Sequence, residues 1–166
     1  MNTSTCCFTG HRPAKFSFKL NEKSQECTLL KSRLRQEILN MITYNGVRHF
    51  ITGMAQGVDL WAAEIVLELK ESYPELTLKA AVPFPEQTEK WRMPQKQRYN
   101  HILELCDQVA VISPKHSSTC MFKRNCYMVN HSDFVIAVWN GSFSCGTGKT
   151  IEYASKQEKS MVIIDC

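Results

Sequence analysis

The sequence predicts an α/β fold: a single Rossmann-like domain of three layers built on a mostly parallel sheet. Short apolar runs alternate along the chain with longer segments whose apolar residues recur at helical spacing. The short runs are apolar almost throughout, which is typical of strands buried on both faces of a parallel sheet. The 166 residues suit one domain, and no repeat, low-complexity stretch or linker divides them. Residues 1–166 are therefore expected to form one unit with right-handed crossovers.

The first half of the chain is expected to contain three strands and two helices. The first strand ends in Gly10, and the first helix follows Ser24, a residue type that caps helices. The second strand ends in Gly53, the second helix has one apolar side, and Pro83 stops the third strand. The expected strands are residues 4–10, 48–53 and 76–84, and the expected helices are residues 24–43 and 57–72.

The second half continues the alternation with three helices and three strands. Pro94 lies near the start of the first of these helices, and Pro114 closes the strand that follows it. The next strand is wholly apolar, and Gly146 opens the last helix. The expected helices are residues 89–106, 119–132 and 146–159, and the expected strands are residues 107–113, 133–141 and 160–165.

Composition excludes several classes of protein. Hydrophobic residues make up 43% and charged residues 22%, as in ordinary globular proteins, and the net charge of +4 includes no dense basic block. Nucleic acid is therefore an unlikely partner, whereas a small anion is compatible. No apolar run suits a membrane helix and the start lacks a signal segment, so a cytoplasmic protein is expected. The eight cysteines form no C-x-x-C pair, which predicts reduced core thiols and no metal site. No cofactor is expected.

The stretch GSFSCGTGKT, residues 141–150, resembles the phosphate loop of ATPases and GTPases but fails its spacing. That loop needs G-x-x-x-x-G-K-[ST], which would place its first glycine at Phe143. Gly141 and Gly146 have the required gap, but Thr147 then stands where the lysine should be. The stretch is instead expected to be a glycine turn that leads from a strand into the last helix.

Candidate ligand-binding residues follow the strands, because ligands of such sheets bind beyond the carboxyl ends of the strands. Three of these loops carry glycine and enter helices, which brings backbone N–H groups and positive helix ends to a phosphate. Arg12 is either a phosphate clamp or a surface arginine, and Asp59 either caps its helix or holds a ribose hydroxyl. Trp139 is better placed to line a pocket than Trp61 or Trp91. The candidates are Gly10, His11, Arg12, Gly53, Met54, Gln56, Asp59, Pro83, Trp139, Gly146, Thr147, Gly148 and Thr150.

Four stretches together resemble the YpsA-like branch of the SLOG superfamily, which includes the DNA-processing protein DprA and the cytokinin-activating LOG enzymes. They are CCFTGHRP, GMAQGVDLWAAE, KRNCYMVNHSDFVIAVWNG and GTGKTIEYA. The resemblance runs from about Cys6 to Asp165. It implies a Rossmann-like fold with a pocket for a nucleotide or a nucleotide-derived ligand, and pairing of two copies through helices.

The LOG enzymes, which cleave the N-glycosidic bond of nucleoside monophosphates, provide a sharper comparison. Their signature M-x-x-R-K-x-x-M resembles MFKRNCYM, with Arg124 matched and Asn125 in place of lysine. Their P-G-G-x-G-T-x-x-E resembles SCGTGKTIE, which places Glu152 at the glutamate. The resemblance therefore implies Arg124 as a ligand contact and Arg124 with Glu152 as a catalytic pair, the carboxylate stabilising a cationic ribose or activating water. The alternative is that Glu152 is an exposed helix carboxylate with Arg124 as its solvent-facing partner.

The predicted function is that of a binding domain for a nucleotide-derived ligand, with a signalling, sensing or sequestering role. The altered signature favours binding over the alternative, a nucleoside-monophosphate phosphoribohydrolase that uses Arg124 and Glu152. Single-stranded DNA binding, as in DprA, is a weaker alternative, because aromatic and basic residues are not interleaved along the chain.

Overall fold

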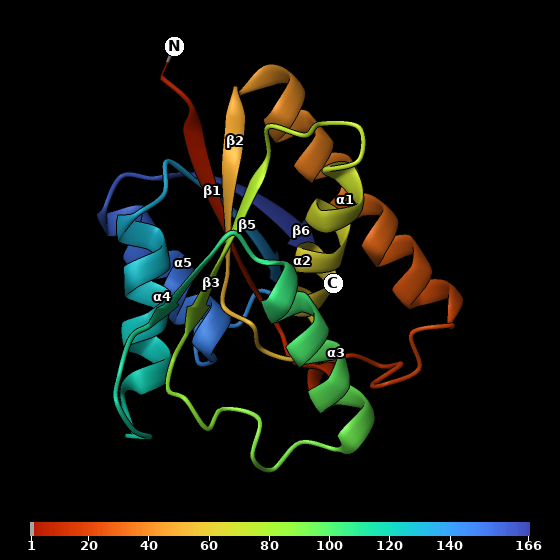
Figure 1. The fold of residues 1–166 in the computed structure, drawn as a ribbon, viewed down its shortest axis with the longest axis vertical. Coiled ribbons are helices and arrows are strands. Elements are labelled where there is room, and N and C mark those ends of the chain that lie inside the picture. The colour runs from red at the N-terminus through yellow and green to blue at the C-terminus, as the bar shows by residue number, and fades with distance from the viewer. Residues whose placement is uncertain (1) are drawn as a thin grey trace.

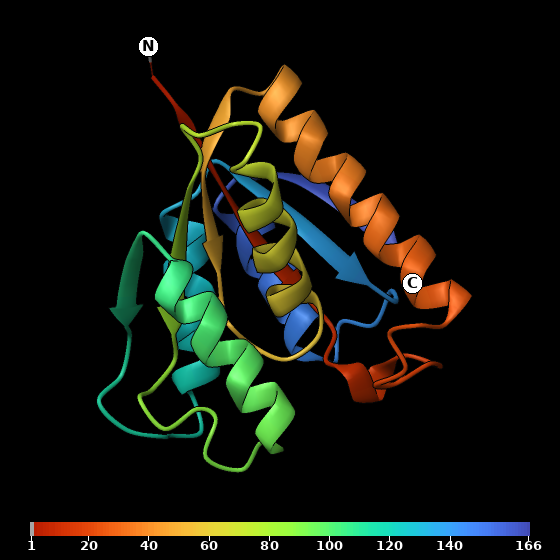
Figure 2. The same cartoon turned by 45° about the vertical axis from the view of Figure 1, so that its right-hand side comes forward.

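The computed structural model describes residues 2–166 as a six-stranded, all-parallel sheet with helices on both faces. Figures 1 and 2 show this three-layer arrangement. The strands are β1 (Ser4–Gly10), β2 (Val47–Thr52), β3 (Thr77–Val82), β4 (Gln108–Val111), β5 (Phe134–Trp139) and β6 (Ser160–Asp165). The helices are α1 (Gln25–Tyr44), α2 (Val58–Leu69), α3 (Met93–Leu105), α4 (Cys120–Asn130) and α5 (Gly146–Lys156), with a 3₁₀ turn, η1, at Pro13–Lys15. The predicted Rossmann-like α/β class is confirmed.

The strand order β4-β3-β2-β1-β5-β6 creates one switch point, between β1 and β5. From β1 the chain adds β2, β3 and β4 outward in one direction, and then crosses back to place β5 on the other side of β1. The loops that follow β1 and β5 consequently leave the sheet in opposite directions and open a crevice between them. All strands are parallel, so their carboxyl ends meet at one edge, toward which the arrows run in Figure 2.

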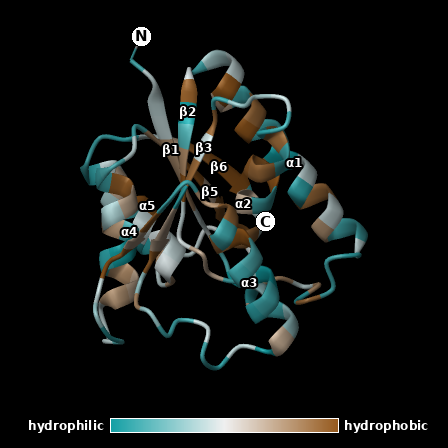
Figure 3. Cartoon of the chain, in the orientation of Figure 1, coloured by the Kyte–Doolittle hydropathy of each residue, from teal (hydrophilic) through white to brown (hydrophobic). Residues whose placement is uncertain are grey.

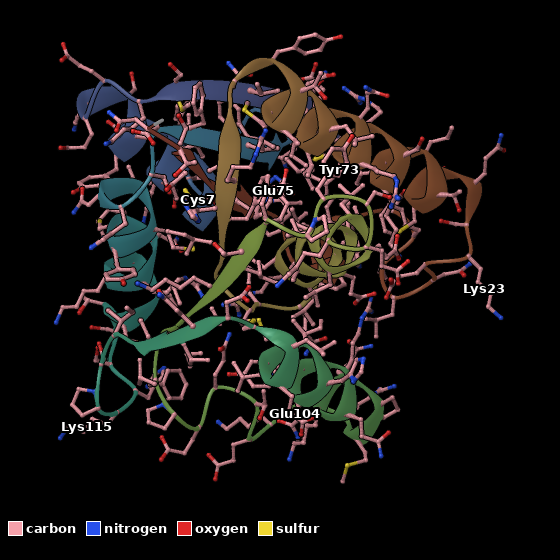
Figure 4. All side chains as sticks on the ribbon, turned by 45° about the horizontal axis from the view of Figure 1, so that its top comes forward. Cys7, Lys23, Tyr73, Glu75, Glu104 and Lys115 are labelled. Carbon is pink, nitrogen blue, oxygen red and sulfur yellow. The ribbon has the colours of Figure 1, made fainter. Side chains whose placement is uncertain are left out.

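Alternate residues of the inner strands fill two separate apolar layers. In β1 the buried Cys6 and Phe8 belong to the layer beneath α1, α2 and α3, whereas Cys7 belongs to the layer beneath α4 and α5. Figure 1 shows these helix groups on opposite faces of the sheet, and Figure 3 shows the hydrophobic colouring gathered between them. In Figure 4, Cys7 lies inside the molecule, whereas Lys23 and Lys115 project outward. The two-residue alternation of side chains thus lets one strand serve both cores.

The outer strands differ from the prediction that the strands are buried on both faces. Val109 and Val111 of β4 are 48% and 52% exposed, because β4 forms an edge of the sheet beyond the reach of α4. Helix α3 also begins later than predicted, at Met93, after a series of turns over residues 85–90. Pro94 explains the late start, since proline fits the first turn of a helix but removes a hydrogen bond further in.

Three features of the described residues bear on the class of protein. No helix among residues 2–166 is long and apolar enough to cross a membrane. The cysteines are unpaired thiols, four of which are buried. Within the same residues, no cluster of three or more His, Cys, Asp or Glu side chains has the arrangement of a metal site.

A network of ion pairs fixes the segment between η1 and α1 to the helices beside it. The Glu22 carboxylate accepts hydrogen bonds from Arg98 Nη1 at 2.5 Å and Nη2 at 2.9 Å, and from Lys31 Nζ at 2.5 Å. Arg98 also donates to Glu64 of α2. Burial alone would raise the pKa of Glu22, but the hydrogen bonds and charges of Arg98 and Lys31 outweigh it and lower the pKa from 4.5 to about 2. The network therefore anchors this segment most strongly when Glu22 is ionised.

Replacement of Glu22 by glutamine should reduce the acid sensitivity of the fold. Because the folded-state pKa of Glu22 is depressed, its contribution is present above pH 4.5 and is lost as the pH falls toward about 2. Urea unfolding at pH 6 should show the Glu22→Gln variant about 1–2 kcal/mol less stable than the wild type. The expected loss is small because the ion-pair network is partly exposed, and solvent weakens its contribution to stability. The difference should shrink at pH 3. A difference that is the same at both pH values would show that the Glu22 charge does not contribute.

Candidate functional site

Two adjoining hollows lie at the carboxyl edge of the sheet, at the switch point. The first compartment, of about 350 Å³, lies between the loops after β1 and β2 and the first turns of α4 and α5. The second compartment, of about 390 Å³, extends from it toward the segments after η1 and β3. Arg12, Ala14, Ala55 and Met121 line both, so the two compartments adjoin each other and are together called the cavity. The two volumes are in the range of small-molecule sites, about 300–1,000 Å³.

A buried arginine forms the floor of the first compartment. Arg124 of α4 is only 4% exposed, and its Nη1 donates to the Gly53 carbonyl while its Nε donates to Asn125 Oδ1 at 2.7 Å. Burial lowers the pKa of Arg124, and the nearby Asp59 partly offsets this effect. Both hydrogen-bond acceptors are neutral, and no described carboxylate lies within 4 Å of the guanidinium. The cavity therefore holds a cation whose charge is only partly compensated.

Asp59 holds the turn between β2 and α2. Its Oδ2 accepts a hydrogen bond from the Ala55 N–H at 3.3 Å, and its backbone carbonyl accepts one from Thr52 Oγ1 at 2.8 Å. Asp59 is 6% exposed; burial raises its pKa, while the positive charge of Arg124 acts in the opposite direction. The carboxylate thus sets the shape of the turn whose Gly53 carbonyl binds Arg124, rather than facing solvent at the end of the helix.

The first turn of α5 presents its positive end to the first compartment. Gly146 and Thr147 line this compartment, and the turn contains no acidic residue. The Cys145 thiol accepts a hydrogen bond from the Gly148 N–H at 3.4 Å, which caps one backbone donor. Arg12 and Lys15 add two further cations to the lining. A helix start beside several cations is a favourable place for a phosphate or carboxylate.

The glycines of the site have different physical roles. A Cβ on Gly10 would lie 2.5 Å from the side chain of Val58, so this glycine lets α2 pack closely on β1. A Cβ on Gly148 would overlap the Ser142 carbonyl, so that glycine lets α5 approach the turn before it. Beside Gly146 a Cβ would meet no described atom within 4 Å. Among the candidate glycines, Gly146 is therefore the one with space for a ligand against its backbone.

His11 joins the loops on the two sides of the switch point. Its Nε2 accepts a hydrogen bond from the Asn140 N–H at 3.0 Å, and its ring is 4% exposed. Burial lowers the pKa of His11, the side chain of Asn140 partly opposes this effect, and the charge of Lys15 adds to the lowering. The neutral ring is thus part of the structure that holds the crevice open.

The structure gathers some of the predicted site residues around the cavity and places others outside it. Thr150 is buried behind the wall, where it accepts a hydrogen bond from Asn125 Nδ2 at 2.9 Å. Trp139 donates to the Ser142 carbonyl at 2.7 Å and packs on Phe143, so it supports the turn before α5. The cavity is lined by Gly10, His11, Arg12, Gln56, Asp59, Arg124, Gly146 and Thr147, whereas Gly53, Met54, Pro83, Trp139, Gly148 and Thr150 lie outside its lining.

Glu152 lies away from the cavity, contrary to the expectation that it faces the ligand beside Arg124. The inward side of α5 carries Thr147, Thr150 and Ile151 at helical spacing, which leaves Glu152 on the outer side. Its side chain is 56% exposed and lies 3.6 Å from Lys156. With the G-T of the LOG signature aligned to Gly146 and Thr147, the buried Thr150 takes the place of the glutamate.

Several lining residues were not predicted. Ala55 and Met121 lie in the stretches that carry the family resemblance but were not chosen as candidates, and Lys15 belongs to no motif. Gln87 and Trp91 of the second compartment also belong to no motif, although they follow the third strand, where ligand residues are expected. The sequence favoured Trp139 over Trp91 because Trp139 ends a strand directly. The turns at residues 85–90 bring Trp91 back to the cavity, and no periodicity reveals that path.

Acidification should weaken the fold through His11. Because its folded-state pKa is lowered, the unfolded chain takes up the proton first, so the His11 contribution is present above about pH 6.5 and is lost as the pH falls below that value. Thermal unfolding at pH 7.5 and pH 5.5 should show a smaller loss for His11→Gln, which does not titrate, than for the wild type. Equal losses in the two proteins would contradict this role.

Comparisons with known proteins agree with this architecture. The family model described as the YspA SLOG family matches residues 6–166. A UPF0398 protein of Bacillus cereus (strain B4264) is 32% identical over 152 residues, and one of Bacillus thuringiensis (strain Al Hakam) is 33% identical over 153. Each alignment covers 90% of this chain and 81% of the relative.

Among solved structures, the chain is similar to DNA processing protein A from Helicobacter pylori, which is described for its single-stranded DNA binding mode. The TM-score is 0.60 at 15% identity, which supports likeness of fold alone. The match covers 96% of this chain, and the chain spans 64% of the length of that protein. The resemblance found in the sequence is confirmed by the family match: the chain belongs to the YspA SLOG family.

Proposed function

We propose that the chain is a binding domain for a nucleotide or nucleotide-derived ligand, whose phosphate lies in the first compartment. The observation that carries the proposal is that the α5 N-terminus and three cations, Arg12, Lys15 and Arg124, all line the first compartment. Asp59 is the single carboxylate among the described lining residues, and burial raises its pKa. The balance of charge in the compartment therefore favours an anion.

The partly compensated guanidinium of Arg124 gives the phosphate its strongest attraction. Nε and Nη1 are used by Asn125 and Gly53, and no described residue accepts a hydrogen bond from Nη2. A phosphate oxygen at this position would form a charge-assisted hydrogen bond in a partly dehydrated site, where such bonds are strongest. The backbone N–H groups of Gly146 and Thr147 would bind the other phosphate oxygens.

The groups beside this position favour retention of the ligand over its cleavage. Where the LOG signature has lysine and glutamate, this chain has Asn125 and Thr150, which hydrogen-bond to each other at 2.9 Å. Thr150 in turn donates to the Gly146 carbonyl at 2.8 Å. Cleavage of an N-glycosidic bond needs a carboxylate near the ribose, and this neutral pair provides none. The one carboxylate in the lining, Asp59, accepts a hydrogen bond from the Ala55 N–H and holds the turn before α2. A sensing, signalling or sequestering role follows from binding without turnover.

Pairing of two copies of the chain, which the family resemblance implies, stays a prediction.

The proposal predicts that the protein binds AMP and releases no adenine from it. Isothermal titration calorimetry would measure the dissociation constant, and chromatography of the same samples would measure free base. Arg12→Met should weaken binding about tenfold, because it removes one charge-assisted contact at a partly exposed position. Arg12 is exposed and has no partner among residues 2–166, so its loss should leave the fold intact.

Two matched controls lie on α5 outside the cavity. Lys149→Met removes the lysine of the apparent phosphate loop, and Glu152→Gln removes the carboxylate implied by the LOG resemblance; both residues border a separate surface hollow. Neither change should alter AMP binding. Base release that is lost in Glu152→Gln or Asp59→Asn would instead establish the hydrolase. Retarded migration of labelled single-stranded DNA at low salt, abolished by Arg12→Met, would favour DNA as the ligand of this cavity.

A further inference from the structure

The second compartment is a site of its own, with a lining unlike that of the first. Apart from Arg12 and Lys19 it is lined by apolar and uncharged residues, and it adjoins the first compartment along the shared residues Ala55 and Met121. Its volume of about 390 Å³ is ample for a bicyclic ring. A ligand whose phosphate lies at the start of α5 would therefore extend its other end into these apolar surroundings.

Two side chains provide flat or apolar surface within the second compartment. Trp91 lines it, and its ring is held in a T-shaped contact with Tyr99, with centroids 5.5 Å apart and an interplanar angle of 85°. Leu20, half exposed although apolar, lines it as well. Nucleobases stack on aromatic side chains, and apolar contacts exclude water from their faces.

Gln87 provides a hydrogen-bond acceptor of fixed orientation. Its Nε2 donates to the Met54 carbonyl at 3.2 Å, so the amide cannot be reversed without losing that bond. Its Oε1 is buried and accepts no hydrogen bond from any residue in the range 2–166. A buried acceptor without a donor costs free energy that a ligand N–H would recover. Because Gln87 lines the second compartment, a ligand group that reaches Oε1 must be a donor, and a carbonyl oxygen would be repelled.

The walls of the second compartment are anchored before any ligand binds. The Gln87 N–H donates to the Phe84 carbonyl at 3.2 Å, which closes the turn after β3. Phe16 and Phe18 stack on each other and pack on Trp61, and this holds the segment that carries Leu20. Anchored walls lower the entropy cost of binding and make the choice of ligand more stringent.

We propose that the second compartment is a nucleobase subsite that selects a purine bearing an amino group. The base packs against Trp91 and Leu20, and its amino N–H donates to Gln87 Oε1. This inference rests on the proposed function, since the phosphate in the first compartment sets the direction in which the base extends.

The test compares four ligands by calorimetry on the wild-type protein and three variants. AMP carries the amino group, purine ribonucleoside 5′-monophosphate lacks it, UMP carries a smaller ring, and ribose 5-phosphate lacks a base. AMP should bind at least tenfold more tightly than each of the others. In Gln87→Met the preference for AMP over purine ribonucleoside monophosphate should disappear, and in Trp91→Leu AMP affinity should fall about tenfold while Trp91→Phe restores most of it. Ribose 5-phosphate should bind all four proteins alike.

The outcomes separate this inference from the proposed function. Ribose 5-phosphate that binds as tightly as AMP would overturn the base subsite and leave the phosphate site standing. Failure of every phosphate ligand to bind would remove the proposed function itself. A preference for purine ribonucleoside monophosphate over AMP, or an AMP preference that survives in Gln87→Met, would show that Gln87 does not select the amino group. Unchanged ribose 5-phosphate affinity in each variant excludes misfolding as the cause of a loss.

Discussion

The buried guanidinium of Arg124 is the constraint on which the rest of the site depends. A buried charge is costly unless hydrogen bonds and opposite charge compensate it. Here the compensation comes from the Gly53 carbonyl, the Asn125 amide and the more distant charge of Asp59. These groups come from the end of β2, from α4 and from α2, so the fold must bring three segments together to keep Arg124 where it is. These groups compensate the positive charge of Arg124 only in part, and the remaining charge can attract an anion.

The topology of the sheet explains how these segments meet. The β1/β5 switch point opens the crevice, and His11 joins its two sides through the Asn140 N–H. At Gly53 a Cβ would lie 2.7 Å from Asp59 Oδ2 and 2.8 Å from Arg124 Nη1, so a larger residue would displace the pair. Gly10 and Gly148 act in the same way for helix packing. Gly10, Gly53 and Gly148 thus allow close packing of the segments that surround the cavity. Among these four candidate glycines, Gly146 alone adjoins open space in the cavity.

The fold was largely predictable from the sequence, and the site was predictable only in part. Each predicted strand and helix exists within a few residues of its expected bounds, because apolar periodicity reports burial directly. The residues directly after strands, such as His11 and Arg12, were correctly placed at the carboxyl edge of the sheet for the same reason: topology determines where they lie. Glu152 was misplaced because a shift of two residues turns a helical side chain to another face. Trp91 was passed over because the turns at residues 85–90, which bring it to the cavity, depend on tertiary contacts such as that of Gln87 with Met54.

A crystal structure of the protein grown with AMP tests the central claim most directly, because it shows both the position of the ligand and whether its glycosidic bond is intact. The account predicts uncleaved AMP, with its phosphate against the backbone of Gly146 and Thr147 and within hydrogen-bond distance of Arg124. Density for ribose 5-phosphate alone beside Arg124, or a phosphate bound elsewhere while this cavity holds only solvent, would contradict it.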